Sequence, residues 1–209
     1  MSGFEESWQA APVAVRRCLE LAHLSLTAGG LAVGAVLVDG AGLVRAEGRN
    51  RAYDGPGGPD LLQGTPLAHA ELNALALVRT GSDLAGLTLW STQQPCAMCA
   101  AALEFTAVGT VRYLAPDPWA LATGQPGADA RPETSEWLVA ANLLFLQSVV
   151  DAADLDHPTV RRNRTLEPET VALLEAEPHS TSTVAELLDT RWQRITDAAS
   201  RRRRRLVRS

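Results

Sequence analysis

The sequence contains few cysteines, no lysine and no long apolar run. Three cysteines in 209 residues are too few for the disulfide framework of a small secreted protein, which needs several pairs. The longest apolar stretch, residues 31–38, is far shorter than the ~20 residues of a membrane-spanning helix. The first residues are acidic and the first basic residue is Arg16, unlike a secretory signal. These absences predict a cytoplasmic protein without a membrane span.

The 19 basic residues are all arginine, and they are unevenly distributed. Residues 191–209 hold eight arginines and one aspartate, a charge of +7, which leaves 11 basic and 23 acidic groups, or −12, in residues 1–190. A body of that charge repels a polyanion, because nucleic-acid affinity depends on cationic contacts. The charge favours a small neutral substrate, and the basic segment 200–209 is expected to be a solvated, disordered tail.

The hydrophobic pattern predicts an α/β fold. Strands are expected at 31–38, 43–50, 87–92 and 111–115, helices at 5–27, 68–80, 96–107, 135–153, 167–177 and 184–199, and loops at 54–66 and 123–134. Pro12 is compatible with the first helix only near its first turn. Strands alternating with short helices predict a sheet with helices packed on it. We expect one domain over residues 1–153 and a helical extension packed on it over 154–199.

Two short motifs carry metal-binding chemistry: His69-Ala-Glu71 and Pro95-Cys96-Ala-Met-Cys99. Cysteines three positions apart on a helix lie on one side of it, and Pro95 indicates that the helix begins there. The positive end of the helix dipole lowers the pKa of thiols at that position. With His69 they would form a Cys₂His zinc site whose fourth position is open for water, as in catalytic zinc sites.

Glu71 and His69 serve one site only if the helix directs its N-terminal tip at the metal. A glutamate beside a zinc-bound water, and not itself a ligand, acts as a general acid and base. Cys-x-x-Cys alone is also typical of a redox pair or of half a structural zinc ribbon. The sequence holds one such motif, so it excludes a four-cysteine ribbon, and the two motifs together favour catalytic zinc.

With these motifs the sequence resembles the cytidine/deoxycytidylate deaminase superfamily of zinc-dependent nucleobase deaminases, whose signature is His-x-Glu with Pro-Cys-x-x-Cys. The resemblance runs from about residue 13 to residue 118 and includes residues 33–38, 48–50 and 108–117. It looks closest to the branch with tRNA adenosine, guanine and fungal-type cytosine deaminases. It implies a three-layer α/β/α sandwich with a mixed sheet of about five strands, usually in a homodimer. The fifth strand would fall near residues 143–149, where the residue pattern predicts a helix, and both readings stay open.

The resemblance also implies roles for individual residues. The histidine and the two cysteines of the motifs would bind Zn²⁺, and Glu71 would shuttle the proton. Asn50 would hydrogen-bond the substrate, although the same residue suits an ordinary turn. Asp117 matches an acidic position that lines the pocket in some relatives, and it also suits a turn between two prolines. Tyr53 and Trp119 are candidates for stacking on a base, although lone aromatic residues more often pack in a core.

The sequence departs from the family pattern at three places. Many relatives carry Glu directly before the Pro-Cys, where this chain has Gln93 and Gln94. The 54–66 loop is longer than a compact tRNA deaminase is expected to have, and some ninety residues follow the last predicted strand. These differences favour a zinc-dependent deaminase of a small nucleobase or nucleoside, which releases ammonia, over a tRNA-specific adenosine deaminase.

Two further alternatives remain. A non-catalytic deaminase-fold binding subunit would be expected to lack Glu71 or a metal ligand, and this sequence keeps all four residues. A structural zinc site would need a fourth protein ligand. Cys18 and His23 are the nearby residues of a suitable type, and both lie on a separate predicted helix.

Overall fold

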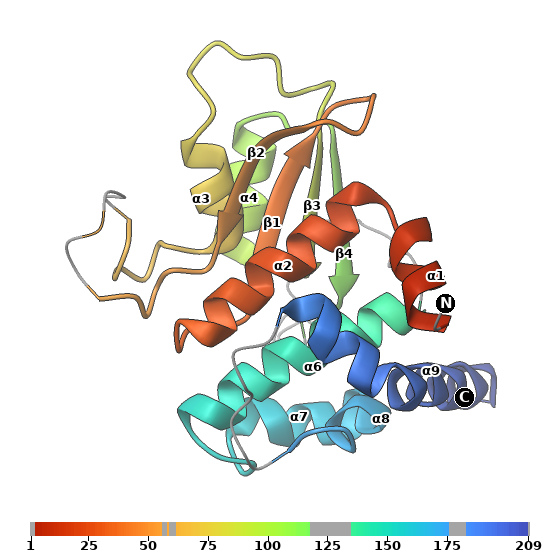
Figure 1. Ribbon diagram of the computed structural model, residues 1–209. Coiled ribbons are helices and arrows are strands. Elements are labelled where there is room, and N and C mark those ends of the chain that lie inside the picture. Colours follow the sequence, from red (N-terminus) through yellow and green to blue (C-terminus); the bar gives the residue numbers. More distant parts are fainter. Residues whose placement is uncertain (1–2, 56–57, 59–61, 118–134, 176–182, 209) are drawn as a thin grey trace.

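A mixed four-stranded sheet lies at the centre of the protein (Figure 1). The computed structural model describes residues 3–208 except 56–57, 59–61, 118–134 and 176–182. The strands are β1 (Gly34–Val38), β2 (Val44–Arg49), β3 (Thr88–Gln93) and β4 (Thr110–Ala115), in the order β2-β1-β3-β4. Strand β1 is antiparallel to β2 and β3, while β3 and β4 are parallel. The four strands lie where the sequence predicts them; the predicted 123–134 loop and Trp119 lie outside the described residues.

Helices cover both faces of this sheet, and alternate side chains of β1 explain why. Val36 and Val38 pack into a cluster with α2 (Val13–Thr27), whereas Ala35 and Leu37 pack toward α3 (Ala70–Ala76) and α4 (Ala97–Phe105). A strand buried on both faces needs apolar residues at consecutive positions, as β1 has. The single helix expected over 5–27 is two helices, because Pro12 separates α1 (Gly3–Ala10) from α2.

The segment for which the resemblance implied a fifth strand is helical. Helix α6 (Ser135–Ala152) contains residues 143–149, so the residue pattern was right there, and the described part of the sheet has four strands instead of about five. Residues 137–150 are buried except Phe145, which is partly buried. Helix α6 is apolar on nearly every side because it packs on α2 and the sheet and is covered by further helices.

The covering helices are α7 (Pro158–Leu166), α8 (Pro168–Val171) and α9 (Val184–Arg208). Four aromatic side chains from α1, α6 and α9 join these helices to the body, with neighbouring ring centroids 4.9–5.8 Å apart: Phe4, Trp8, Trp137 and Trp192. Helix α7 was not expected from the sequence, and the helix predicted over 167–177 is described only as the short α8. In the described part of the chain, no helix is long and apolar enough to cross a membrane.

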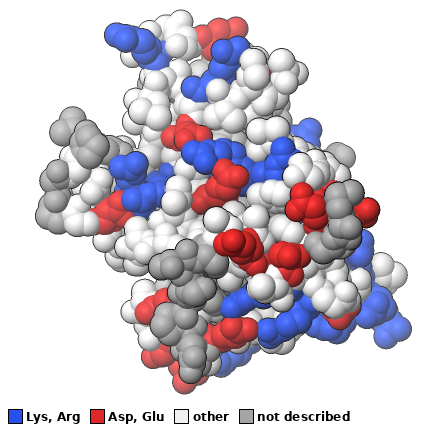
Figure 2. All heavy atoms as spheres, viewed as in Figure 1, with Lys and Arg blue, Asp and Glu red and all other residues white. Residues whose placement is uncertain are grey.

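The arginine run does not form the disordered tail expected from its charge. Helix α9 continues through it to Arg208. Arg202 pairs with Glu167, Arg205 with Glu169 and Arg203 with Glu136. Figure 2 shows the resulting mixture of basic and acidic side chains along the lower edge of the molecule. Arginine is a good helix former and is favourable near a helix C-terminus, so carboxylates supplied by other helices suffice to hold the run.

Candidate metal centre

The two sequence motifs meet at the N-terminal tips of two helices. His69 is the N-cap of α3 and Cys96 is the N-cap of α4, both with extended backbone, and Cys99 lies in the first turn of α4. His69 precedes the regular helix and Glu71 lies in its first turn, so the tip of α3 brings both residues to one site, as the sequence motifs require. Gly48 of β2 allows this arrangement, since a Cβ there would clash with the Ala70 carbonyl oxygen.

The donor atoms of the histidine and the cysteines converge. The ligand atoms of His69, Cys96 and Cys99 lie within 4.8 Å of one another, and His69 Nδ1 is 3.5 Å from each sulfur. Tetrahedral zinc, with Zn–S of about 2.3 Å and Zn–N of about 2.0–2.1 Å, requires nitrogen and sulfur to be about 3.5 Å apart. The donor set therefore fits Zn²⁺ both in chemistry and in spacing.

Hydrogen bonding within the group shifts the pKa values of the two thiols in opposite directions. Hydrogen bonds from Cys99 and then His69 lower the pKa of Cys96 to about 3, against desolvation. The same pairing raises the pKa of Cys99 and of His69, because each donor is held by the Cys96 thiolate. Cysteine binds a metal as the thiolate and histidine as the neutral imidazole, so a bound cation would take the place of the protons that these three side chains share.

Glu71 lies beside the metal ligands but outside their group. Its Oε1 accepts a hydrogen bond from Ser91 Oγ at 2.9 Å, and its Oε2 lies 3.5 Å from the Cys99 sulfur. The side chain is buried, and burial raises the pKa of this carboxyl group. A buried carboxylate held in one orientation and with a raised pKa has the properties of a general acid and base.

The metal ligands open into a cavity of about 170 Å³. Asn50 and Asp117, the predicted substrate contacts, both line it. Asn50 is buried and its Oδ1 accepts from the Ala52 N–H at 3.1 Å, so this oxygen stabilises the turn after β2. The Asp117 N–H donates to Gln94 Oε1 at 3.2 Å, which fixes the segment after β4 at the cavity wall.

Gln93 is a cavity residue that sequence reasoning did not assign to the site. It is 6% exposed, and among the described residues neither its Oε1 nor its Nε2 has a hydrogen-bond partner. A buried amide without partners costs about 1–3 kcal/mol per group, which makes it a candidate for pairing with a ligand. Its one signal in the sequence was the departure from the family pattern before Pro95.

Cys18 and His23, the candidates for a fourth metal ligand, both lie in helix α2. The Cys18 thiol is fully buried and donates to the Trp90 carbonyl oxygen at 3.4 Å, and burial raises its pKa. His23 is also buried in helix α2. In the described part of the chain neither belongs to the metal-binding group. The three-ligand set leaves one position of a tetrahedral zinc ion without a protein ligand.

The fold and this site define a zinc-binding α/β protein with an open metal coordination position and an adjoining buried carboxylate. Residues 9–115 match the family model described as the cytidine and deoxycytidylate deaminase zinc-binding region, and the chain belongs to that family. His69, Cys96 and Cys99 are its zinc-binding group.

Individual relatives cover parts of the chain. The chain is 36% identical over 109 residues to a tRNA-specific adenosine deaminase of Haemophilus influenzae, covering 49% of this chain and 57% of that relative. A guanine deaminase structure from Bacillus subtilis is 29% identical, with a TM-score of 0.43, over 53% of this chain and 68% of that one. A structure solved in complex with 8-azaguanine is 23% identical, with a TM-score of 0.50, over 69% and 87%. That last match supports the fold alone.

Proposed function

We propose that the protein is a zinc-dependent hydrolytic deaminase that replaces an exocyclic amino group of a nucleobase, nucleoside or related heterocycle with oxygen and releases ammonia. The observation that carries the proposal is the position of Glu71, buried and held by Ser91 beside a three-ligand zinc site. When bound, Zn²⁺ would supply a water whose pKa is lowered to about 7. Structural zinc usually has four protein ligands, whereas three protein ligands leave the fourth position for a water molecule. The site is therefore of the type that supports hydrolysis.

Glu71 performs the proton transfers in this proposal. One Oε atom accepts a proton from the attacking water and delivers it to the ring nitrogen adjacent to the amino-bearing carbon. A second proton then passes through the same carboxyl group to the departing amine. Water and the amino-heterocycle thus become the oxo-heterocycle and ammonia. Ser91 Oγ holds the carboxylate by hydrogen-bonding one oxygen, which keeps the other directed at the metal ligands.

Substrate contacts would come from three cavity residues. Asn50 and Asp117 bring an amide and a carboxylate to the cavity, and Gln93 brings an amide whose two polar atoms have no partner among the described residues. An amide that presents a donor and an acceptor side by side pairs with a heterocycle edge that presents the complementary two groups. We assign Gln93 to this role together with the predicted Asn50 and Asp117.

A tRNA-specific adenosine deaminase is the second candidate, favoured by the similarity to the Haemophilus influenzae enzyme of that name. The acidic body disfavours it, and Arg202, Arg203 and Arg205 are engaged by carboxylates of the protein itself.

A homodimer and a cytoplasmic location are also proposed. Ala101 and Phe105 expose an apolar strip of α4 for a second copy, and thiol ligands suit a reducing compartment.

Replacing Glu71 by Gln tests the mechanism, because it removes the ionisable group and keeps the shape. We expect zinc content to be unchanged while kcat falls at least 100-fold, the lower end for loss of a general acid and base. Glu104→Gln is the matched control, because Glu104 is exposed on α4. Full activity of Glu71→Gln with zinc present would refute the assigned role.

A further inference from the structure

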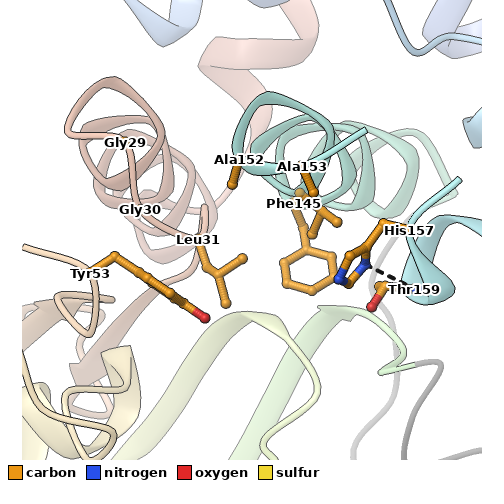
Figure 3. Close-up of a pocket in the computed structure, with 10 residues that line it drawn as sticks. Gly29, Gly30, Leu31, Tyr53, Phe145, Ala152, Ala153, His157 and Thr159 are labelled. Atoms are coloured by element: carbon orange, nitrogen blue, oxygen red, sulfur yellow. Dashed lines mark hydrogen bonds between the residues drawn. The ribbon is translucent and has the colours of Figure 1, made fainter. Parts of the chain in front are cut away.

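A second and larger cavity adjoins the metal-site cavity. Its volume is about 420 Å³, against about 170 Å³ for the inner one. Leu31 and Phe145 line both cavities, so the two cavities meet at these side chains. In Figure 3 Tyr53 lies beside Leu31 and His157 beside Phe145, around one hollow. The inner cavity is smaller than the 300–1,000 Å³ typical of small-molecule sites, and the outer cavity lies within that range.

The outer cavity is lined mainly by carbon. Gly29 and Gly30 at the end of α2, and Val149, Ala152 and Ala153 in and after α6, contribute apolar surface. Its polar side-chain groups are the hydroxyls of Tyr53 and Thr159 and the imidazole of His157.

One ring nitrogen of His157 is already engaged in a hydrogen bond. Its Nδ1 accepts from the Thr159 N–H at 3.3 Å, so in the neutral ring the proton is on Nε2. Among the described residues that line the two cavities there is no arginine, and the carboxyl groups are Glu71 and Asp117. Among these described lining residues a phosphate group would find carboxylates and no guanidinium partner.

We propose, resting on the proposed deaminase function, that the substrate is an uncharged amino-heterocycle carrying an apolar substituent of about aryl size. The heterocycle occupies the inner cavity beside the metal ligands, and the substituent passes Leu31 and Phe145 into the outer cavity. Helices α6 and α7 build that outer wall, and they follow the part of the chain that matches the family model. Specificity for the substituent is thus assigned jointly to the C-terminal helices and to the segments at residues 29–31 and Tyr53.

The test measures binding apart from turnover. Zinc-loaded Glu71→Gln protein is titrated calorimetrically with three pairs of probes, each a free base and its benzyl derivative. The pairs are adenine and 9-benzyladenine, guanine and 9-benzylguanine, and cytosine and 1-benzylcytosine. For at least one base we expect the benzyl derivative to bind about tenfold tighter than the parent, equal to about 1.4 kcal/mol. Adenosine, guanosine and cytidine carry a polar ribose at the same ring position and should not show that gain.

Two tryptophan variants locate the gain. Ala152 is exposed and lines the outer cavity, so Ala152→Trp fills the cavity without disturbing the core, and the tenfold gain should disappear. Ala172 is an exposed alanine that does not line the cavity, so Ala172→Trp should keep the gain. No tighter binding of any benzyl derivative, an equal gain for the nucleosides, or a gain that survives Ala152→Trp would each overturn the proposal. If the gain and its loss occur while wild-type protein releases no ammonia from any probe, the deaminase proposal fails and the binding site stands.

Discussion

Removing Arg202 should destabilise the protein far more than removing an exposed arginine of the same helix. Arg202 donates from Nε and Nη2 to both carboxylate oxygens of Glu167, at 2.6 and 2.7 Å, and the two side chains are 15% and 6% exposed. Arg202→Ala leaves the Glu167 carboxylate buried without its cation, which costs about 3–5 kcal/mol for a buried pair. We take about 3 kcal/mol, because the arginine retains some exposure. At roughly 2–4 °C per kcal/mol for a chain of this length, Tm should fall by roughly 6–12 °C.

The assay is thermal unfolding followed by circular dichroism, repeated in urea to obtain the free energy of unfolding. Arg204→Ala is the control, because Arg204 is exposed, and its effect should stay within about 0.5 kcal/mol. The double variant Arg202→Leu/Glu167→Leu removes both charges and should recover most of the lost stability. Similar small changes for Arg202→Ala and Arg204→Ala would refute the claim that the arginine run is part of the folded structure.

Three further predictions concern the metal, the cavity and pH. Cys96→Ala should abolish stoichiometric zinc binding measured by atomic absorption, because two protein donors remain; normal zinc content would remove Cys96 from the ligand set. Gln93→Leu should raise KM roughly 10–100-fold for a hydrogen-bonding substrate while Tm is unchanged or higher, because the unpaired amide is gone; an unchanged KM would exclude a substrate contact. The Arg205 guanidinium lowers the pKa of Glu169, so this pair stabilises the fold above the unfolded pKa of about 4.3 and the stabilisation is lost as pH falls through the folded pKa. The Tm of Glu169→Gln should therefore fall less than that of the wild type between about pH 5 and pH 3, and identical slopes would contradict the linkage.

The metal centre could be predicted from the sequence because its signals are local. Pro95 directly precedes Cys96, the N-cap of α4, and Cys99 lies in the first turn, so both sulfurs lie at the same helix tip. The strands were likewise predictable, since their apolar residues and flanking turns lie within short windows. The position of Glu71 beside the metal ligands was also predictable, because His69 lies at the N-terminal tip of α3 and Glu71 lies in the first turn.

Features that depend on distant segments could not be predicted. The arginine run looked solvated because its carboxylate partners, among them Glu136 and Glu167, lie some 35 or more residues away. An apolar segment such as 143–149 is ambiguous by periodicity, and only its burial among helices decides that it is helical. The environment of the Gln93 amide and the outer cavity both arise from packing between helices and strands. The spacing of residues along the sequence therefore does not predict them.

Ammonia release by metal-quantified protein tests the central claim most directly. The panel comprises free bases, their benzyl derivatives, nucleosides, nucleotides and bulk tRNA, with zinc-loaded Glu71→Gln as the blank. We expect release from at least one small uncharged heterocycle and none above the blank from tRNA. Release from tRNA alone would reverse the choice of substrate, and no release from any member of the panel by fully zinc-loaded wild-type protein would contradict the deaminase assignment.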